Sequence, residues 1–263
     1  MNAIHAIILG VVEGITEFLP ISSTFHLIFS AKILGIQQND FSKLFEVVIQ
    51  SGAILSVLLL YFTDVVKDRE IQKKIIFSFI PTAIIGLILH KIIKDVFFTA
   101  DYLMLSVFII VGVIFIISEY LVKKDKIKLS KHLESLTYKE AIIIGLVQAL
   151  AVLPGVSRAG SVILGMMFLR FKREDAARYS FMLSIPTIFA ASALDAFKMR
   201  KLLFSSSQDM ILLSISFVAA FISSYFVVKW LISYLQKHTL TAFGWYRIIM
   251  GILILGTLFF KFY

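Results

Sequence analysis

The sequence of 263 residues contains no cysteine and only four prolines, and 16% of its residues are charged. Without cysteine the chain has no disulfide bond, no thiol nucleophile and no thiolate metal site. The low charge accompanies a hydrophobic content of 59% and a mean hydropathy of +0.91. Soluble domains are about 45–50% apolar and about 25% charged, so the composition indicates a membrane protein.

Sequence motifs of several enzyme classes are also missing. The chain has no Gly-x-x-x-x-Gly-Lys loop, no His-Glu-x-x-His and no Gly-x-Ser-x-Gly, which sets aside P-loop, zincin and α/β-hydrolase chemistry. No His-x-x-x-Asp follows Arg158, although the acid-phosphatase type of lipid phosphatase would need one. The net charge of +9 does not indicate a nucleic-acid partner, because the basic residues lie in loops between apolar segments, as the positive-inside rule describes.

Apolar segments of about 20 residues, the length that crosses a bilayer, recur along the chain. Six are long enough: Leu44–Phe62, Ile75–Ile93, Tyr102–Val122, Ala176–Phe197, Met210–Leu235 and Trp245–Phe262. Two others, Ala3–Leu34 and Lys139–Leu169, are broken by proline and small polar residues. Irregular backbone at membrane depth is tolerated only where protein buries it or where it lines a cavity, so we interpret both as re-entrant helix hairpins.

An internal repeat organises these segments. Ala6-Ile-Ile-Leu-Gly-Val-Val-Glu13 resembles Ala141-Ile-Ile-Ile-Gly-Leu-Val-Gln148, and Leu19-Pro-Ile-Ser22 resembles Leu153-Pro-Gly-Val-Ser157. Each copy is a hairpin followed by three spans, and an odd number of spans inverts the second copy. The sequence therefore predicts an all-α membrane protein with six transmembrane helices and two re-entrant hairpins in an inverted repeat. The first repeat is residues 1–122, the polar linker 123–138 and the second repeat 139–263.

Loop charge orients this arrangement. The loops assigned to the cytoplasm hold 14 Lys and Arg residues, against 8 on the other side, which favours outside N- and C-termini. The two hairpins then enter from opposite faces of the membrane. We expect their tips to meet at one site near the midplane.

The first tip carries two carboxylates and three hydroxyls. Glu13 and Glu17 are four residues apart, so a helix places them on one face, and a charge at the bilayer centre costs about 2.5–3.5 kcal/mol. Protonation or an interfacial position would remove that cost; so would a shared divalent cation, Mg²⁺ or Ca²⁺, which takes hard oxygen ligands. Ser22, Ser23 and Thr24 are expected to cap the next half-helix or to bind an anion at its N-terminus. His26, one turn further, is either structural or a proton carrier.

The second tip carries the opposite charge. Pro154-Gly155 opens the chain, Ser157 is placed to cap, and Arg158 starts the next half-helix. Arg158 either pairs with a glutamate or binds phosphate oxygens with its planar fork, and Gly155 allows a close backbone approach. Together the tips predict a site for a highly charged anion such as diphosphate. Glu46 and Gln50, four residues apart at the head of the first span, are expected behind the site, with an interfacial glutamate as the alternative.

Two long motifs resemble one family. Gly10-Val-Val-Glu-Gly-Ile-Thr-Glu-Phe-Leu-Pro-Ile-Ser-Ser-Thr-Phe-His26 and Pro154-Gly-Val-Ser-Arg-Ala-Gly160 are similar to the undecaprenyl-diphosphate phosphatases associated with bacitracin resistance, as are Phe45–Gly52 and Ser180–Pro186. The resemblance implies a multi-pass bacterial inner-membrane enzyme that removes the terminal phosphate of undecaprenyl diphosphate and regenerates carrier lipid for peptidoglycan synthesis.

The resemblance also implies residue roles. Glu13 and Glu17 would be metal-linked carboxylates and Ser23 the nucleophile, with Thr24 and His26 beside it, and Ser157 and Arg158 would bind phosphate. Two positions depart from the family pattern: Phe25 replaces a common Gly and Ala159 a common Ser.

Several alternatives stay open at this stage. A transporter or flippase for an anionic polyprenyl lipid would share the inverted repeat and Arg158, but would not need paired glutamates beside a hydroxyl. Ser23, His26 or a water molecule could attack phosphorus. The expected partners are a polyprenyl diphosphate lipid and membrane lipid, and a homodimer is left open. Tyr246, near a span end, is interpreted as an interface anchor.

Overall fold

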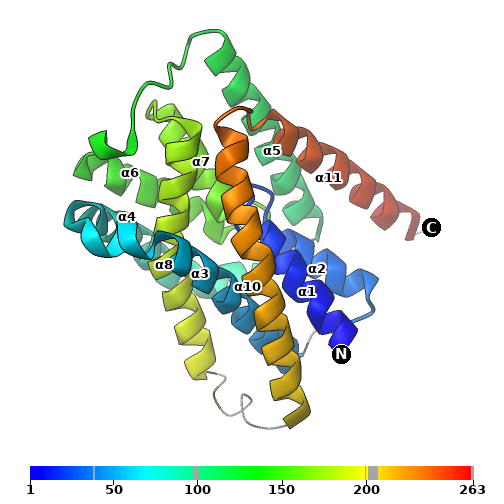
Figure 1. The fold of residues 1–263 in the computed structure, drawn as a ribbon. Helices are drawn as coiled ribbons and strands as arrows, with labels where there is room; N and C mark the ends of the chain where they lie inside the picture. Colours follow the sequence, from blue (N-terminus) through cyan, green and yellow to red (C-terminus); the bar gives the residue numbers. More distant parts are fainter. Residues whose placement is uncertain (38, 97–100, 199, 201–206, 262–263) are drawn as a thin grey trace.

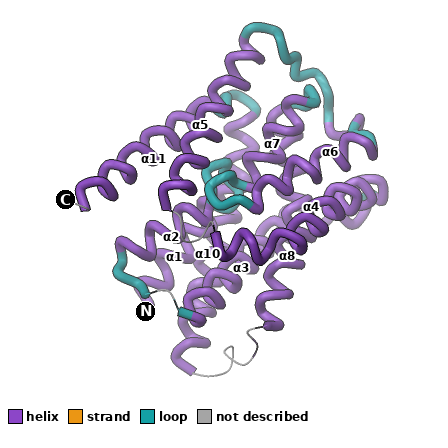
Figure 2. The backbone as a smooth tube through the Cα atoms, turned by 180° about the vertical axis from the view of Figure 1, so that it is seen from behind, coloured by secondary structure: helices purple, strands orange, loops and turns teal. Residues whose placement is uncertain are grey.

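The computed structural model describes residues 1–37, 39–96, 101–198, 200 and 207–261. The regular structure in these ranges is helical and includes no strand (Figure 1). The prediction of an all-α protein is therefore confirmed. A long loop, followed by one short 3₁₀ turn (η1, Leu133–Ser135), joins the two halves of the chain at the edge of the molecule (Figure 2).

Among the residues that the structure describes, five helices are long and apolar enough to cross a membrane, judged by length and composition over Leu44–Lys67, Arg69–Leu89, Asp101–Lys123, Arg173–Lys198 and Gln208–Leu235. They belong to α3 (Asp40–Lys67), α4 (Arg69–Val96), α5 (Asp101–Lys123), α8 (Arg173–Lys198) and α10 (Ser207–Leu235). The sixth predicted span corresponds to α11 (Thr241–Lys261), of which Thr241–Thr257 counts among the shorter apolar helices. The chain is thus an all-helical protein with several helices that fit a bilayer.

Both predicted breaks are present. In the first, α1 (Ala3–Thr16) ends before Pro20 and α2 starts at Ser23 (Ser23–Ile33). In the second, α6 (Tyr138–Ala149) passes through a 3₁₀ turn (η2, Leu150–Val152) before α7 starts (Arg158–Phe168). The residue before each restart, Ser22 or Ser157, has a positive φ, 69° and 76° respectively. A positive φ is uncommon outside glycine. Each hairpin therefore has its unusual backbone conformation at an equivalent serine, directly before the second helix starts.

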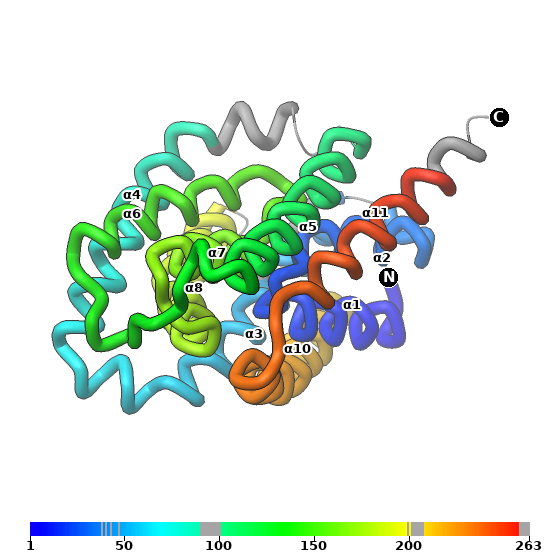
Figure 3. The backbone as a smooth tube through the Cα atoms, turned by 90° about the horizontal axis from the view of Figure 1, so that it is seen from above, coloured from blue at the N-terminus to red at the C-terminus, as the bar shows by residue number. Residues whose placement is uncertain are grey.

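Irregular backbone in a membrane must be buried in protein or line a cavity. Protein buries the first break and the last residues of the second, whereas the η2 turn of the second break is not buried and its Leu150 is 57% exposed. Phe18 is completely buried in the first turn, and Val156 is 9% exposed in the second. Each hairpin packs on a long helix from the other half of the chain: α1 lies along α10, and α6 lies along α4 (Figures 1 and 3).

Glycine allows these helices to approach closely. A Cβ on Gly10 of α1 would lie 2.5 Å from the carbonyl oxygen of Ser216 in α10. A Cβ on Gly145 of α6 would lie 2.1 Å from the carbonyl oxygen of Ser78 in α4. The two glycines occupy matching places in the sequence repeat. The inverted relation between the two repeats stays a prediction.

A buried ion pair joins three elements at one end of the bundle. Glu119 of α5 is 5% exposed, and its Oε1 accepts hydrogen bonds from Arg173 Nε at 2.8 Å and from the backbone N–H of Leu240 at 2.8 Å. Arg173 starts α8, and Leu240 precedes α11. This carboxylate therefore fixes α5, α8 and α11 relative to one another.

Glu119→Ala should lower the free energy of unfolding by about 3–5 kcal/mol, because it leaves a largely buried arginine without its partner. Thermal unfolding in detergent is the measurement. Glu70→Ala is the matched control, since Glu70 pairs with Lys73 on the surface, and its midpoint should stay near that of the wild type. Equal midpoints for the two variants would contradict the stabilising role of Glu119 in the packing of α5, α8 and α11.

Candidate active site

The two breaks meet around one cavity of about 170 Å³. Residues of the first hairpin, the second hairpin, α3 and α8 line it: Glu17, Ser22, Ser23, Thr24, Gln50, Ala151, Val152, Leu153, Pro154, Gly155, Ser157, Arg158 and Ile188. The predicted site residues all line this cavity except Glu13, His26 and Glu46. Segments more than a hundred residues apart in sequence thus form a single polar pocket inside the helical bundle.

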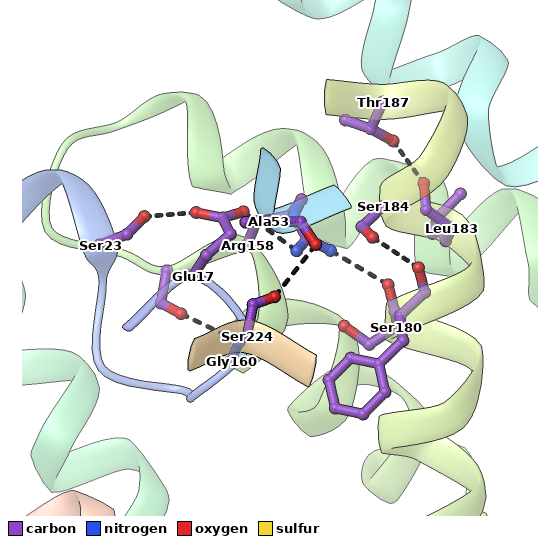
Figure 4. Close-up of polar contacts among 12 residues, drawn as sticks. Glu17, Ser23, Ala53, Arg158, Gly160, Ser180, Leu183, Ser184, Thr187 and Ser224 are labelled. Atoms are coloured by element: carbon purple, nitrogen blue, oxygen red, sulfur yellow. Dashed lines mark hydrogen bonds and ion pairs between the residues drawn. The ribbon is translucent and has the colours of Figure 1, made fainter. Parts of the chain in front are cut away.

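Glu17 links the two tips. It caps the C-terminal end of α1, and its Oε2 accepts a hydrogen bond from the hydroxyl of Ser23. Its Oε1 accepts a hydrogen bond from Arg158 Nη2 at 3.2 Å, and both side chains are about nine-tenths buried. Figure 4 shows Glu17 lying between Ser23 and Arg158. The pairing of Arg158 with a glutamate, left open by the sequence, is therefore present, and the glutamate is Glu17.

The Glu17 contact uses only one of the three guanidinium nitrogens of Arg158. Nη1 donates to the backbone carbonyl of Ser180 in α8 at 3.0 Å (Figure 4). Its Nε is buried without a hydrogen-bond partner among the residues that the structure describes. A buried donor without a partner is costly, and an anion in the cavity that Arg158 lines would remove that cost.

The two helix N-termini at the cavity differ in their caps. The hydroxyl of Ser157 accepts a hydrogen bond from the N–H of Gly160 at 3.2 Å, so Ser157 caps α7 as predicted. Ser22 makes no side-chain cap on α2, so of the two roles expected for it capping is absent and anion binding stays a prediction. Its φ of 69° turns the chain sharply at the start of the helix. The uncapped start of α2 is therefore suited to binding an anion through its N–H groups.

Glu13 lies behind the cavity and does not line it. The side chain is completely buried, and neither carboxylate oxygen has a hydrogen-bond partner in the described part of the chain. The carboxylates of Glu17 and Glu46 and the guanidinium of Arg158 all lie close enough to interact with it electrostatically. A buried carboxylate without a partner is unfavourable unless it holds a proton or a cation.

Glu46 and Gln50 of α3 line two different cavities. Gln50 lines the main cavity, whereas Glu46 lines a small apolar cavity beside α1 and α2. No group of three or more His, Asp or Glu side chains able to hold a metal occurs among the described residues. Glu13 and Glu17 are the neighbouring carboxylates whose oxygens could hold a cation.

His26 does not line the cavity. Its Nδ1 is 2.8 Å from the carbonyl oxygen of Ser22, and its Nε2 is 2.7 Å from the hydroxyl of Tyr246, on which the imidazole stacks. A carbonyl oxygen only accepts, so Nδ1 carries the proton and Nε2 accepts from Tyr246 when the ring is neutral. Both ring nitrogens are thus hydrogen-bonded, one to the backbone of Ser22 and one to the hydroxyl of Tyr246.

Sequence reasoning missed the contribution of α11. Tyr246 was interpreted as an interface anchor, yet its hydroxyl bonds His26. Arg247 received no role, yet it is completely buried and bonds backbone carbonyls at both tips. A signal existed for Arg247, because an arginine inside an apolar span is costly and usually functional. No local pattern pointed to the Tyr246 contact.

Fold and site together define a multi-pass membrane protein with a polar cavity, lined by Glu17 and Arg158, between two helix hairpins. Residues 6–253 match the family described as bacitracin resistance protein BacA, and the chain belongs to that family.

Similar proteins cover nearly the whole chain. An undecaprenyl-diphosphatase of Aquifex aeolicus is 44% identical over 252 residues, which are 96% of this chain and 97% of that protein. An undecaprenyl-diphosphatase of Sulfurihydrogenibium is 44% identical over 253 residues, 96% of this chain and 98% of that protein. One of Wolinella succinogenes is 43% identical over 255 residues, 97% of this chain and 98% of that protein.

Proposed function

We propose that this protein hydrolyses undecaprenyl diphosphate to undecaprenyl phosphate and inorganic phosphate in the bacterial plasma membrane, and so recycles carrier lipid for cell-wall synthesis. The names of its relatives support this activity. The observation that carries it is the Glu17 carboxylate, which bonds Ser23 on one side and Arg158 on the other within one cavity. A base, a hydroxyl and a phosphate-binding fork thereby share one volume.

The membrane arrangement that we propose has six transmembrane helices, with α11 as the sixth, and two re-entrant hairpins in an inverted repeat. The order of helix lengths supports it. Hairpin helices of 14 and 11 residues precede helices of 28, 28 and 23 residues in the first half. Helices of 12 and 11 residues precede helices of 26, 29 and 21 residues in the second half.

The head group binds at the polar side of the cavity. Arg158 and the N–H groups at the start of α2 bind the terminal phosphate, and the hydroxyls of Ser22, Thr24 and Ser157 and the backbone at Gly155 complete the set of contacts. The apolar side of the lining, formed by η2 and Ile188, receives the first isoprene units. Positioning and electrostatic stabilisation are most of what phosphoryl transfer requires from a protein.

Ser23 is the nucleophile in this proposal. Its Oγ attacks the terminal phosphorus, its proton passes to Glu17, and the bridging P–O bond breaks to release undecaprenyl phosphate. Water then attacks the phosphorus of the phosphoserine, the bond from phosphorus to Ser23 Oγ breaks as Glu17 returns its proton to that oxygen, and phosphate leaves as dihydrogen phosphate with both protons of the water. The hydrogen bond from Ser23 to Glu17 supports the first of these proton transfers. His26 acts through Ser22, because both of its ring nitrogens are already bonded.

A divalent cation, Mg²⁺ or Ca²⁺, is also part of the proposal. Glu13 and Glu17 would hold it, and its charge would neutralise the diphosphate. The buried, unpartnered carboxylate of Glu13 fits this role, because hard cations take carboxylate oxygens and Mg²⁺ often uses only one or two of them beside substrate phosphates.

Mg²⁺ should stabilise the purified protein in the presence of a non-hydrolysable diphosphonate, by about 2.7 kcal/mol at a hundred times the dissociation constant. Glu13→Gln should abolish most of that gain, because the amide loses the charge that attracts the cation. The measurement is the unfolding midpoint with and without Mg²⁺, and Glu70→Gln on the surface is the control. A Glu13→Gln variant that gains as much as the wild type would exclude Glu13 as a ligand.

Tyr246→Phe should lower kcat about two- to tenfold with little change in KM, because one hydrogen bond to His26 is worth about 0.5–1.5 kcal/mol. Steady-state phosphate release from a polyprenyl diphosphate is the measurement. Trp245→Phe, at an exposed neighbouring position, is the control and should behave as the wild type. An unchanged kcat for Tyr246→Phe would show that the contact does not support the tip.

Phosphate release from undecaprenyl diphosphate by the purified protein in detergent tests the proposed function. We expect release by the wild type, and acid quenching should trap phosphate on Ser23. Ser23→Ala should yield no phosphoenzyme, and Ser233→Ala, a surface serine, serves as its control. No release by a folded wild type, together with movement of a labelled polyprenyl lipid across vesicles, would replace hydrolysis with transport.

A further inference from the structure

Arg247 of α11 bonds the backbone of both helix breaks. The residue is completely buried, and its guanidinium donates to three backbone carbonyls on separate segments. Nε bonds Phe108 of α5 at 3.0 Å, Nη1 bonds Pro20 in the first break at 3.2 Å, and Nη2 bonds Gly155 in the second break. One side chain therefore contacts both tips.

These contacts need an arginine. The planar guanidinium presents donors in several fixed directions, whereas lysine offers a single compact ammonium group. The aromatic rings of Phe108 and Phe115 lie 4.4 Å and 5.7 Å from the guanidinium carbon. Arg247 forms no ion pair with a carboxylate in the part of the chain that the structure describes. Carbonyl dipoles and ring faces thus compensate its charge only in part.

The carbonyl partners sit next to the site. Pro20 precedes Ser22 by two residues, and Gly155 lines the cavity and precedes Arg158 by three. Gly155 has a φ of +94°, and a Cβ there would lie 2.6 Å from the carbonyl oxygen of Met104. The second tip is therefore tightly held on one side by α5 and on the other by Arg247.

We propose that Arg247 is a positioning residue for the diphosphate site: it holds the two tips at the spacing at which Glu17 bonds Ser23 and Arg158 together. This inference rests on the proposed function. A displacement of about 1 Å between reacting groups lowers the rate about 10²-fold. The effect on kcat should therefore be far larger than the effect on substrate binding at Arg158 itself.

Kinetics of Arg247→Met and Arg247→Lys, each normalised to folded protein, form the first test. We expect kcat to fall about 10²-fold in Arg247→Met with KM changed less than about threefold, and Arg247→Lys to recover part of the loss. Arg178→Met, which removes a half-exposed partner of Asp64, is the control and should keep the wild-type kcat. If Arg247→Met does not fold, the lysine variant decides alone: a lowered kcat at unchanged KM supports the proposal, and a wild-type kcat overturns it.

The spacing itself can be measured without any activity, because the chain has no cysteine. Spin labels on Ile33→Cys at the end of α2 and Phe168→Cys at the end of α7 occupy exposed positions on the two half-helices. We expect a single narrow distance distribution with Arg247 present and a broadened or shifted one in Arg247→Met or Arg247→Lys. An unchanged distribution with unchanged kcat would overturn the role of Arg247. An inactive wild type with the expected change in spacing would overturn the proposed function only.

Discussion

Glu17→Gln is expected to lower kcat for phosphate release from undecaprenyl diphosphate about 10³- to 10⁴-fold. The carboxylate accepts the Ser23 proton in the proposed reaction, and removing a positioned general base costs up to about 10⁴ in rate. The amide also has only one acceptor oxygen, so it cannot accept from Ser23 and Arg158 through separate oxygens as Glu17 does. The change therefore removes both the base and the link between the tips.

The measurement is single-turnover phosphate release, which separates chemistry from product release. Glu70→Gln, at a surface ion pair, is the control and should keep the wild-type rate. A Glu17→Gln rate within tenfold of the wild type would exclude Glu17 as the base and leave it a purely structural role.

Arg158→Met should lower kcat/KM about 10²- to 10³-fold, the usual cost of removing one preorganised donor to developing negative charge. It should also lower the free energy of unfolding by about 3–5 kcal/mol, because the Glu17 carboxylate is about nine-tenths buried and loses its cation. Both effects follow from the same ion pair.

The double variant Glu17→Gln/Arg158→Met distinguishes the two effects. It should regain part of the lost stability, since neither member of the pair is then a buried charge, while staying inactive. Kinetics and thermal unfolding of the four proteins give the coupling energy, with Arg178→Met as the single-variant control. Additive losses in stability would mean that Glu17 and Arg158 do not pair in the membrane.

The sequence predicted the helix breaks and most of the residues that line the cavity, but not the contacts that individual side chains make. Pro20 and Pro154 marked both breaks, and the small polar residues after them marked the cavity lining. These breaks can be predicted locally, because proline cannot donate a backbone hydrogen bond within a helix. The ring of His26 was expected near the tip and does lie one turn from it, but it does not line the cavity and instead bonds the backbone of Ser22 and the hydroxyl of Tyr246.

The sequence also could not predict which turn of a helix lies beside the site. Glu46 and Gln50 share one face of α3, yet only Gln50 reaches the cavity, because packing against α1 and α2 sets which helical turn lies beside the tips. Arg247 lies 92 residues beyond Gly155 and contacts it only through the pairing of α11 with α5. Long-range helix packing of this kind leaves no local pattern.

Phe25 shows how a departure from the family pattern is accommodated. It stands where the sequence resemblance leads us to expect glycine, and its ring is almost fully buried against Phe108, with ring centroids 3.7 Å apart. Phe108 in turn lies against the guanidinium of Arg247. The larger side chain thus adds to the support behind the first tip and does not occupy the cavity.

Cross-linking between the two tips tests the central claim most directly. In the cysteine-free chain, Thr24→Cys and Val152→Cys would place one thiol from each hairpin in the same cavity. A protease site inserted at Asp125–Lys128 in the linker would reveal whether the two halves are joined. We expect a short bifunctional thiol reagent to join them within one molecule, and methylene diphosphonate to prevent it. Two thiols that each react with a monofunctional reagent but never join would contradict a single site built by both tips.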